Sequence, residues 1–75
     1  MKIEVLGTGC KKCKQLYQAA QDAIDIKVID AELVKIEDMK DIIAYGVMST
    51  PALVIDGKVV SSGKVLKAKK IAEML

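Results

Sequence analysis

The chain has 75 residues, which leaves room for one small domain, and we expect a single domain over residues 1–75. All 12 of its cationic residues are lysines, it has no histidine, and its net charge is +2. Its only aromatic side chains are those of two tyrosines. It therefore lacks the arginine forks and stacking rings of nucleic-acid-binding proteins, and imidazole chemistry is excluded.

The first two predicted elements are a strand and a helix that meet at a glycine-rich turn. Apolar side chains predict a short buried strand over residues 2–6. Gly7 and Gly9 allow a tight backbone path after it. From Cys10 onward, apolar residues recur at the helical spacing i, i+3, i+4, i+7, and this helix is expected to end between residues 23 and 28.

The middle of the chain predicts a second strand and a short helix. The strand lies within residues 28–35 and is centred on 31–34. Asp38 is placed to cap the helix and Gly46 to end it. Three methionines are expected to fill gaps in the core, because their spacing forms no metal-binding cluster: Met39, Met48 and Met74.

The last third of the chain predicts a hairpin and a final helix. Asp56-Gly57 between two apolar runs is a strong signal for a hairpin. Ser62-Gly63 is expected to start the last helix, whose apolar stripe continues to Leu75. The element order is therefore β-α-β-α-β-β-α, which places the chain in the α/β class.

The two cysteines carry the chemistry that the sequence predicts. Cys10 and Cys13 are three positions apart at the start of a helix, where Cβ atoms lie about 5–6 Å apart on one face, close to the span of a disulfide. The helix N-terminus and the cations of Lys11 and Lys12 favour a thiolate. We therefore expect reversible dithiol–disulfide chemistry, although both lysines are also consistent with plain exposed surface.

The setting of the chain is expected to be the cytosol. No apolar run approaches the ~18 residues of a membrane helix. The first residues, Met1-Lys2-Ile3-Glu4, lack the features of a signal peptide. In a reducing compartment, a lone cysteine pair is more typical of redox chemistry or metal binding than of a structural disulfide. A monomer that binds neither membrane nor nucleic acid is expected.

The element order, the C-x-x-C after the first strand and Thr50-Pro51 before the hairpin resemble the thioredoxin fold. The likeness is greatest to the minimal thioredoxin- or glutaredoxin-like small redox-active disulfide proteins of archaea and bacteria. It implies a four-stranded mixed sheet ordered 2-1-3-4, with helices on both faces. It also implies a thiol–disulfide oxidoreductase or electron carrier that needs no cofactor beyond its own disulfide. A separate reductase would reduce it, and protein disulfides would be its substrates.

The resemblance also implies roles for single residues. Cys10 matches the nucleophilic cysteine and Cys13 the resolving one. Pro51 matches the cis-proline of the family, and the backbone of Thr50 would pair with the substrate. The chain departs from the family pattern between the cysteines, where Lys-Lys replaces the Gly-Pro of thioredoxins, and at Gly9, where thioredoxins have tryptophan.

Glu4 has two interpretations. It lies six residues before Cys10, the spacing at which thioredoxins keep a buried acid that handles protons for the resolving cysteine. The alternation of the first strand instead predicts that Glu4 faces solvent or the sheet edge, and this is the favoured expectation.

A second function class is a Cu(I) carrier. The Gly-x-x-Cys-x-x-Cys loop resembles that of the small heavy-metal-associated domains, which hold Cu(I) between two thiolates, and soft sulfur ligands suit that ion. Those domains have the order β-α-β-β-α-β and end in a strand, whereas a helix is predicted to end this chain. The redox interpretation is therefore preferred, with no metal expected.

Overall fold

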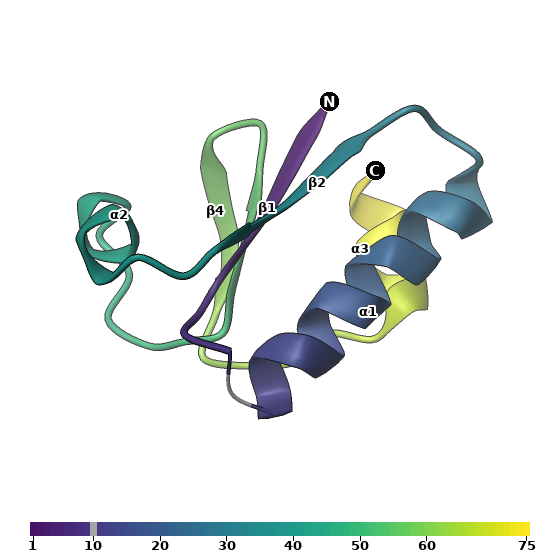
Figure 1. Cartoon of the computed structure of the whole chain (residues 1–75). Coiled ribbons are helices and arrows are strands. Elements are labelled where there is room, and N and C mark those ends of the chain that lie inside the picture. The colour runs from purple at the N-terminus through teal and green to yellow at the C-terminus, as the bar shows by residue number, and fades with distance from the viewer. Residues whose placement is uncertain (10) are drawn as a thin grey trace.

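The computed structural model describes residues 1–9 and 11–75, so Cys10 lies outside the described residues. Seven elements follow one another in the predicted order (Figure 1). Their bounds are β1 (Lys2–Leu6), α1 (Lys11–Lys27), β2 (Glu32–Ile36), α2 (Met39–Ala44), β3 (Ala52–Ile55), β4 (Lys58–Ser62) and α3 (Ala68–Met74).

The four strands form one mixed sheet in the order β2-β1-β3-β4. β1 and β2 are parallel, with Lys2 opposite Glu32 and Leu6 opposite Ile36. β3 runs antiparallel to β1, and β4 runs antiparallel to β3 with an irregularity in the register at Leu53. The predicted fold class and strand order are thus confirmed, and β1 is a central strand.

The helices cover the two faces of the sheet unequally. The long α1 and the short α3 pack side by side on one face, and α2 lies on the other (Figure 1). The larger core cluster lies under α1 and α3 and includes Ile3, Leu16 and Ile71. The smaller cluster lies under α2 and comprises Leu6, Ile42, Ala52 and Val54. Alternate residues of β1 therefore enter different halves of the core.

The structure confirms the predicted ends of α2 and the predicted hairpin turn. The side chain of Asp38 accepts a hydrogen bond of 2.9 Å from the backbone N–H of Lys40 at the start of α2. Gly46 follows the C-cap of that helix with a φ of +75°. Between β3 and β4, Asp56 and Gly57 both have positive φ, as a two-residue hairpin turn requires.

The predicted start of the last helix was wrong, because α3 begins at Ala68 rather than at Ser62-Gly63. β4 continues to Ser62, which pairs with Ala52. Gly63 then has a φ of +74°, and its N–H donates to the carbonyl of Pro51 at 2.8 Å. This bond holds the chain beside the start of β3, so the helix begins only after residues 64–67. Among the described residues, no helix is long and apolar enough to cross a membrane.

Candidate active site

Cys13 lies in the first turn of α1 and is buried. Its sulfur packs directly against the backbone of Gly7, so that a Cβ atom on Gly7 would overlap it. The Cβ of Thr50 lies 4.0 Å from the same point. The fold therefore brings the end of β1, the start of α1 and the segment before β3 together at one thiol.

The neighbours of Cys10 frame this thiol, although Cys10 itself lies outside the described residues. Gly9 precedes it with a φ of +88°, and α1 begins at Lys11. Lys11 and Lys12 are both exposed, and the first turn of the helix contains no acidic residue. The positive charge of the helix N-terminus and the charges of two lysines therefore lie in the same turn as Cys13.

Thr50 and Pro51 lie on the opposite side of the site from α1. The peptide bond between them is cis, Pro51 is fully buried, and Thr50 is exposed. Thr50 thus lies at the surface close to Gly7, a residue remote in sequence. The structure brings Thr50, Pro51 and Cys13 to one end of the sheet, as the sequence motifs implied.

The expectation that Glu4 faces solvent or the sheet edge was wrong, because its side chain is only 6% exposed. β1 is central in the sheet and both of its faces are covered, so alternation along it does not separate inside from outside. The hydroxyl of Tyr45 donates to Glu4 Oε2 at 2.5 Å. The ammonium of Lys2 lies 3.7 Å from Oε1. The hydrogen bond to Glu4, together with burial, raises the pKa of Tyr45 above its ordinary value.

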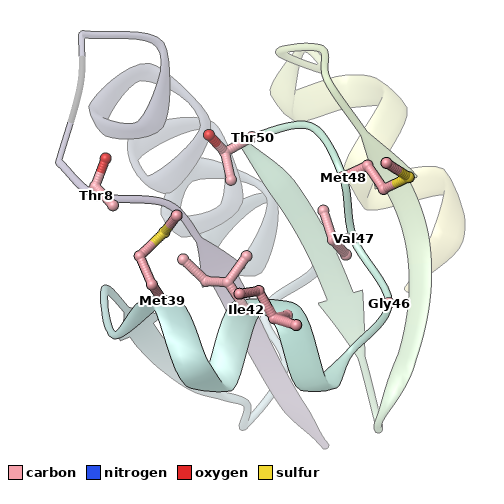
Figure 2. A pocket seen from close by; sticks show the side chains of 8 residues that line it. Thr8, Met39, Ile42, Gly46, Val47, Met48 and Thr50 are labelled. Atoms are coloured by element: carbon pink, nitrogen blue, oxygen red, sulfur yellow. The ribbon is translucent and has the colours of Figure 1, made fainter.

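An open pocket of about 620 Å³ adjoins the site on the α2 side (Figure 2). Apolar residues of α2 and of the segment before β3 form most of its wall, with one threonine at each side: Thr8, Met39, Ile42, Ile43, Gly46, Val47, Met48 and Thr50. The pocket lining includes Thr8, next to Gly7 in the chain, and Thr50, whose Cβ lies near Gly7 and the Cys13 sulfur.

The exposed apolar wall of this pocket was not predicted. Met39 is 57% exposed and Met48 is 99% exposed, so the expectation that both fill core gaps was wrong. The helix α2 has only six residues and directs one buried side chain, Ile42, at the sheet. Ile43 is left 66% exposed on the pocket side. Large apolar residues gathered on a surface in this way are typical of an interaction site.

Sequence reasoning also missed Glu37. The end of β2 runs beside the end of β1, and the N–H of Gly7 donates to the carbonyl of Ile36 at 2.9 Å. Glu37 comes next, and its Oε2 lies 3.3 Å from the point that a Cβ on Gly9 would occupy. A carboxylate therefore lies against the residue that precedes Cys10. The parallel pairing of the two strands was the signal that could have revealed it.

The whole chain, residues 1–75, matches the family described as thioredoxin domain. The chain belongs to the thioredoxin family. It is 37% identical over 75 residues to a curated protein named thioredoxin from Methanothermobacter thermautotrophicus, a match that covers all of this chain and 97% of the relative. It is 40% identical over 73 residues to a thioredoxin from Methanocaldococcus jannaschii, which covers 97% of this chain and 84% of the relative.

Membership in the thioredoxin family decides the general activity. Thioredoxins are thiol–disulfide oxidoreductases, and this chain is one. The β-α-β-α-β-β-α order and the 2-1-3-4 sheet are those of a thioredoxin-like fold. Both assignments agree with the expectations drawn from the C-x-x-C and Thr-Pro motifs.

Proposed function

We propose that this thioredoxin-family chain is a protein-disulfide reductant or electron carrier that works through the Cys10-Lys11-Lys12-Cys13 dithiol. The Cys10 thiolate attacks one sulfur of a target disulfide, which releases the other as a thiolate and leaves a mixed disulfide. The Cys13 thiolate then attacks Cys10 of that bond and frees the second target thiol. The dithiol loses two electrons and two protons, and the target gains them.

The observation that carries this proposal is the position of Cys13. Its sulfur is buried against Gly7 in the first turn of α1 and is shielded from bulky targets. A buried thiol of this kind suits the second step, in which only the neighbouring mixed disulfide must be reached. The attacking role in the first step is therefore assigned to Cys10, the other cysteine of the pair.

Target binding is assigned to Thr50, Pro51 and the apolar pocket. The backbone of Thr50 is proposed to pair with an extended segment of the target; the exposure of Thr50 and the burial of Pro51 beside it support this role. The pocket beside Thr50 offers Met39, Ile43 and Met48 to apolar side chains near the target disulfide. A separate reductase is proposed to restore the dithiol, in a cytosolic monomer that uses no further cofactor.

Two further roles concern protons and charge. Lys11 and Lys12 are proposed to stabilise the Cys10 thiolate together with the N-terminus of α1. Glu4 is proposed to take part in moving the proton of Cys13; its buried carboxylate also accepts a hydrogen bond from the Tyr45 hydroxyl and lies near the Lys2 ammonium, on the α2 side of the sheet. A proton-transfer role for Glu4 would appear as a changed pH dependence of the second step in Glu4→Gln.

The two cysteine roles are tested by trapping. Cys13→Ser is expected to accumulate a mixed disulfide with target proteins, because the attack that resolves it is lost, whereas Cys10→Ser accumulates none. Non-reducing electrophoresis after reaction with an oxidised protein substrate measures both. Equal trapping by the two variants, or trapping by neither, would show that the assignment is wrong. A dithiol titration of the wild type should give a two-electron couple between about −120 and −300 mV.

No structural observation favours the Cu(I) carrier, so we do not propose it as a second function. The chain ends in α3 rather than in a strand, and it belongs to the thioredoxin family. Titration of the reduced protein with Cu(I) against a competing chelator provides the direct comparison with the redox titration.

A further inference from the structure

Glu37 places a negative charge at the entrance to the redox loop. Its Oε2 lies 3.3 Å from the point where a Cβ of Gly9 would be, and Gly9 directly precedes Cys10. The sheet holds Glu37 near Gly9, because the hydrogen bond from the Gly7 N–H to the Ile36 carbonyl joins the segments that follow β1 and β2. Any molecule that approaches Cys10 past Gly9 therefore meets this carboxylate.

The charge of Glu37 is not neutralised by a lysine in the part of the chain that the structure describes. The salt bridges found there join Lys2 to Glu4 and Lys70 to Glu73. The neighbouring carboxylate of Asp38 accepts a hydrogen bond from the Lys40 backbone as the cap of α2. Glu37 is exposed to solvent and open to an incoming charge.

The lysines of the loop follow Cys10 in the sequence. Lys11 and Lys12 follow it in the first turn of α1, whereas Glu37 lies against the residue that precedes it. The described residues on either side of Cys10 in the sequence thus bring a carboxylate against Gly9 and two exposed ammonium groups to the start of α1.

We propose that Glu37 is a specificity-determining residue that disfavours anionic disulfides and favours disulfides with a cation next to the sulfur. The inference rests on the proposed role of Cys10 as the attacking thiol. Coulomb attraction between Glu37 and a substrate cation raises the encounter rate, and repulsion of a substrate anion lowers it. Glu37 touches no reacting atom and takes no part in the exchange itself.

Three small disulfides separate charge selection from general reactivity: cationic cystamine, neutral 2-hydroxyethyl disulfide and anionic dithiodiglycolate. Each is mixed with protein that has been reduced with dithiothreitol and desalted. Cys10 and Cys13 are then oxidised to one disulfide while the probe is reduced to two thiols, so electrons and protons balance. The rate of loss of protein thiols gives the rate constant for each probe.

The measured quantity is the ratio of the cystamine rate constant to the dithiodiglycolate rate constant. In Glu37→Gln this ratio is expected to fall by about fivefold at low ionic strength, as expected for one charge acting over a loop-sized distance in water. The change should nearly vanish at ~1 M salt, where the screening length is about 3 Å. Glu37→Lys should shift the ratio further in the same direction.

Asp41→Asn is the matched control, because it removes one exposed carboxylate from α2 without touching the loop. An equal change of the ratio in both variants, or no change in Glu37→Gln and Glu37→Lys, would overturn the inference. A common change in all three rate constants would also overturn it, because the charge would then act on the thiol. Failure of the neutral probe to oxidise the wild-type dithiol would instead count against the proposed function.

Discussion

At the scale of single residues, the lack of a side chain at Gly7 makes room for the sulfur of Cys13. The sulfur of Cys13 occupies the space where any other residue at position 7 would place its Cβ. This requirement concerns space rather than backbone conformation. The contact between Gly7 and Cys13 joins the end of β1 to the first turn of α1. The Cys13 thiol is buried there, while Lys11 and Lys12 stay exposed.

The variant Gly7→Ala is expected to displace the Cys13 sulfur. The overlap should lower the free energy of unfolding by about 1–3 kcal/mol, the usual cost of overpacking a core. It should also slow the release of a small mixed disulfide, because Cys13 no longer lies in its place. Urea unfolding and the rate of this second step measure the two effects.

The background variant Cys13→Ala supplies the control. With the sulfur removed, Gly7→Ala should cost less stability, and the double-mutant cycle gives the interaction between the two positions. An equal cost of Gly7→Ala in both backgrounds would mean that the sulfur does not set the constraint.

At the scale of elements, α2 divides its side chains between fold and surface. Ile42 is the one buried residue of this helix and forms part of the pocket wall, whereas Met39 and Ile43 line the same pocket but stay largely exposed. A longer helix would cover more of the sheet and leave less of the apolar wall open. The shortness of α2, fixed by the Asp38 cap and Gly46, therefore creates the pocket beside the thiol.

The variant Ile43→Gln tests the pocket. Because Ile43 is largely exposed, the free energy of unfolding should change by no more than about 0.5 kcal/mol. The kcat/KM for a protein disulfide should fall severalfold, while the rate with 2-hydroxyethyl disulfide stays the same. Ile26→Gln on α1, 59% exposed and outside the pocket, is the matched control. Equal loss with the small and the protein substrates would argue against target binding in the pocket.

At the scale of the whole molecule, the bond between Tyr45 and Glu4 links the α2 layer to the central strand and makes stability depend on pH. The hydrogen bond to Glu4, then burial and the charges of Glu4 and Asp41, raise the pKa of Tyr45 above 10.0. The neutral hydroxyl is thus favoured in the folded state. Its contribution to stability is fully present below pH 10 and is lost as the pH rises through the folded-state pKa.

Comparison of the wild type with Tyr45→Phe should isolate this contribution. The difference between their free energies of unfolding is expected to stay constant from pH 7 to about pH 9.5 and to shrink above pH 10, as measured by urea unfolding. Tyr17→Phe is the control, since Lys35 lies 4.9 Å from the centre of the Tyr17 ring, a contact that phenylalanine keeps. A difference that is unchanged through pH 11 would contradict the assigned linkage.

Much of the fold could be predicted because its signals are local. The helical period of α1, the Asp38 cap and the Asp56-Gly57 turn each depend on residues a few positions apart. The C-x-x-C and Thr50-Pro51 motifs were enough to predict the strand order through family resemblance. The sequence by itself therefore determined the elements and their order, whereas the dithiol chemistry assigned to the two cysteines stays a prediction.

The tertiary structure alone decided what faces what. Glu4 is buried because α2 covers its strand, and α3 starts late because Gly63 bonds to Pro51 across the sheet. The exposed wall at Met39 and the carboxylate of Glu37 beside Gly9 arise from packing between remote segments. Such contacts depend on which elements become neighbours, and spacing along the chain carries no record of that.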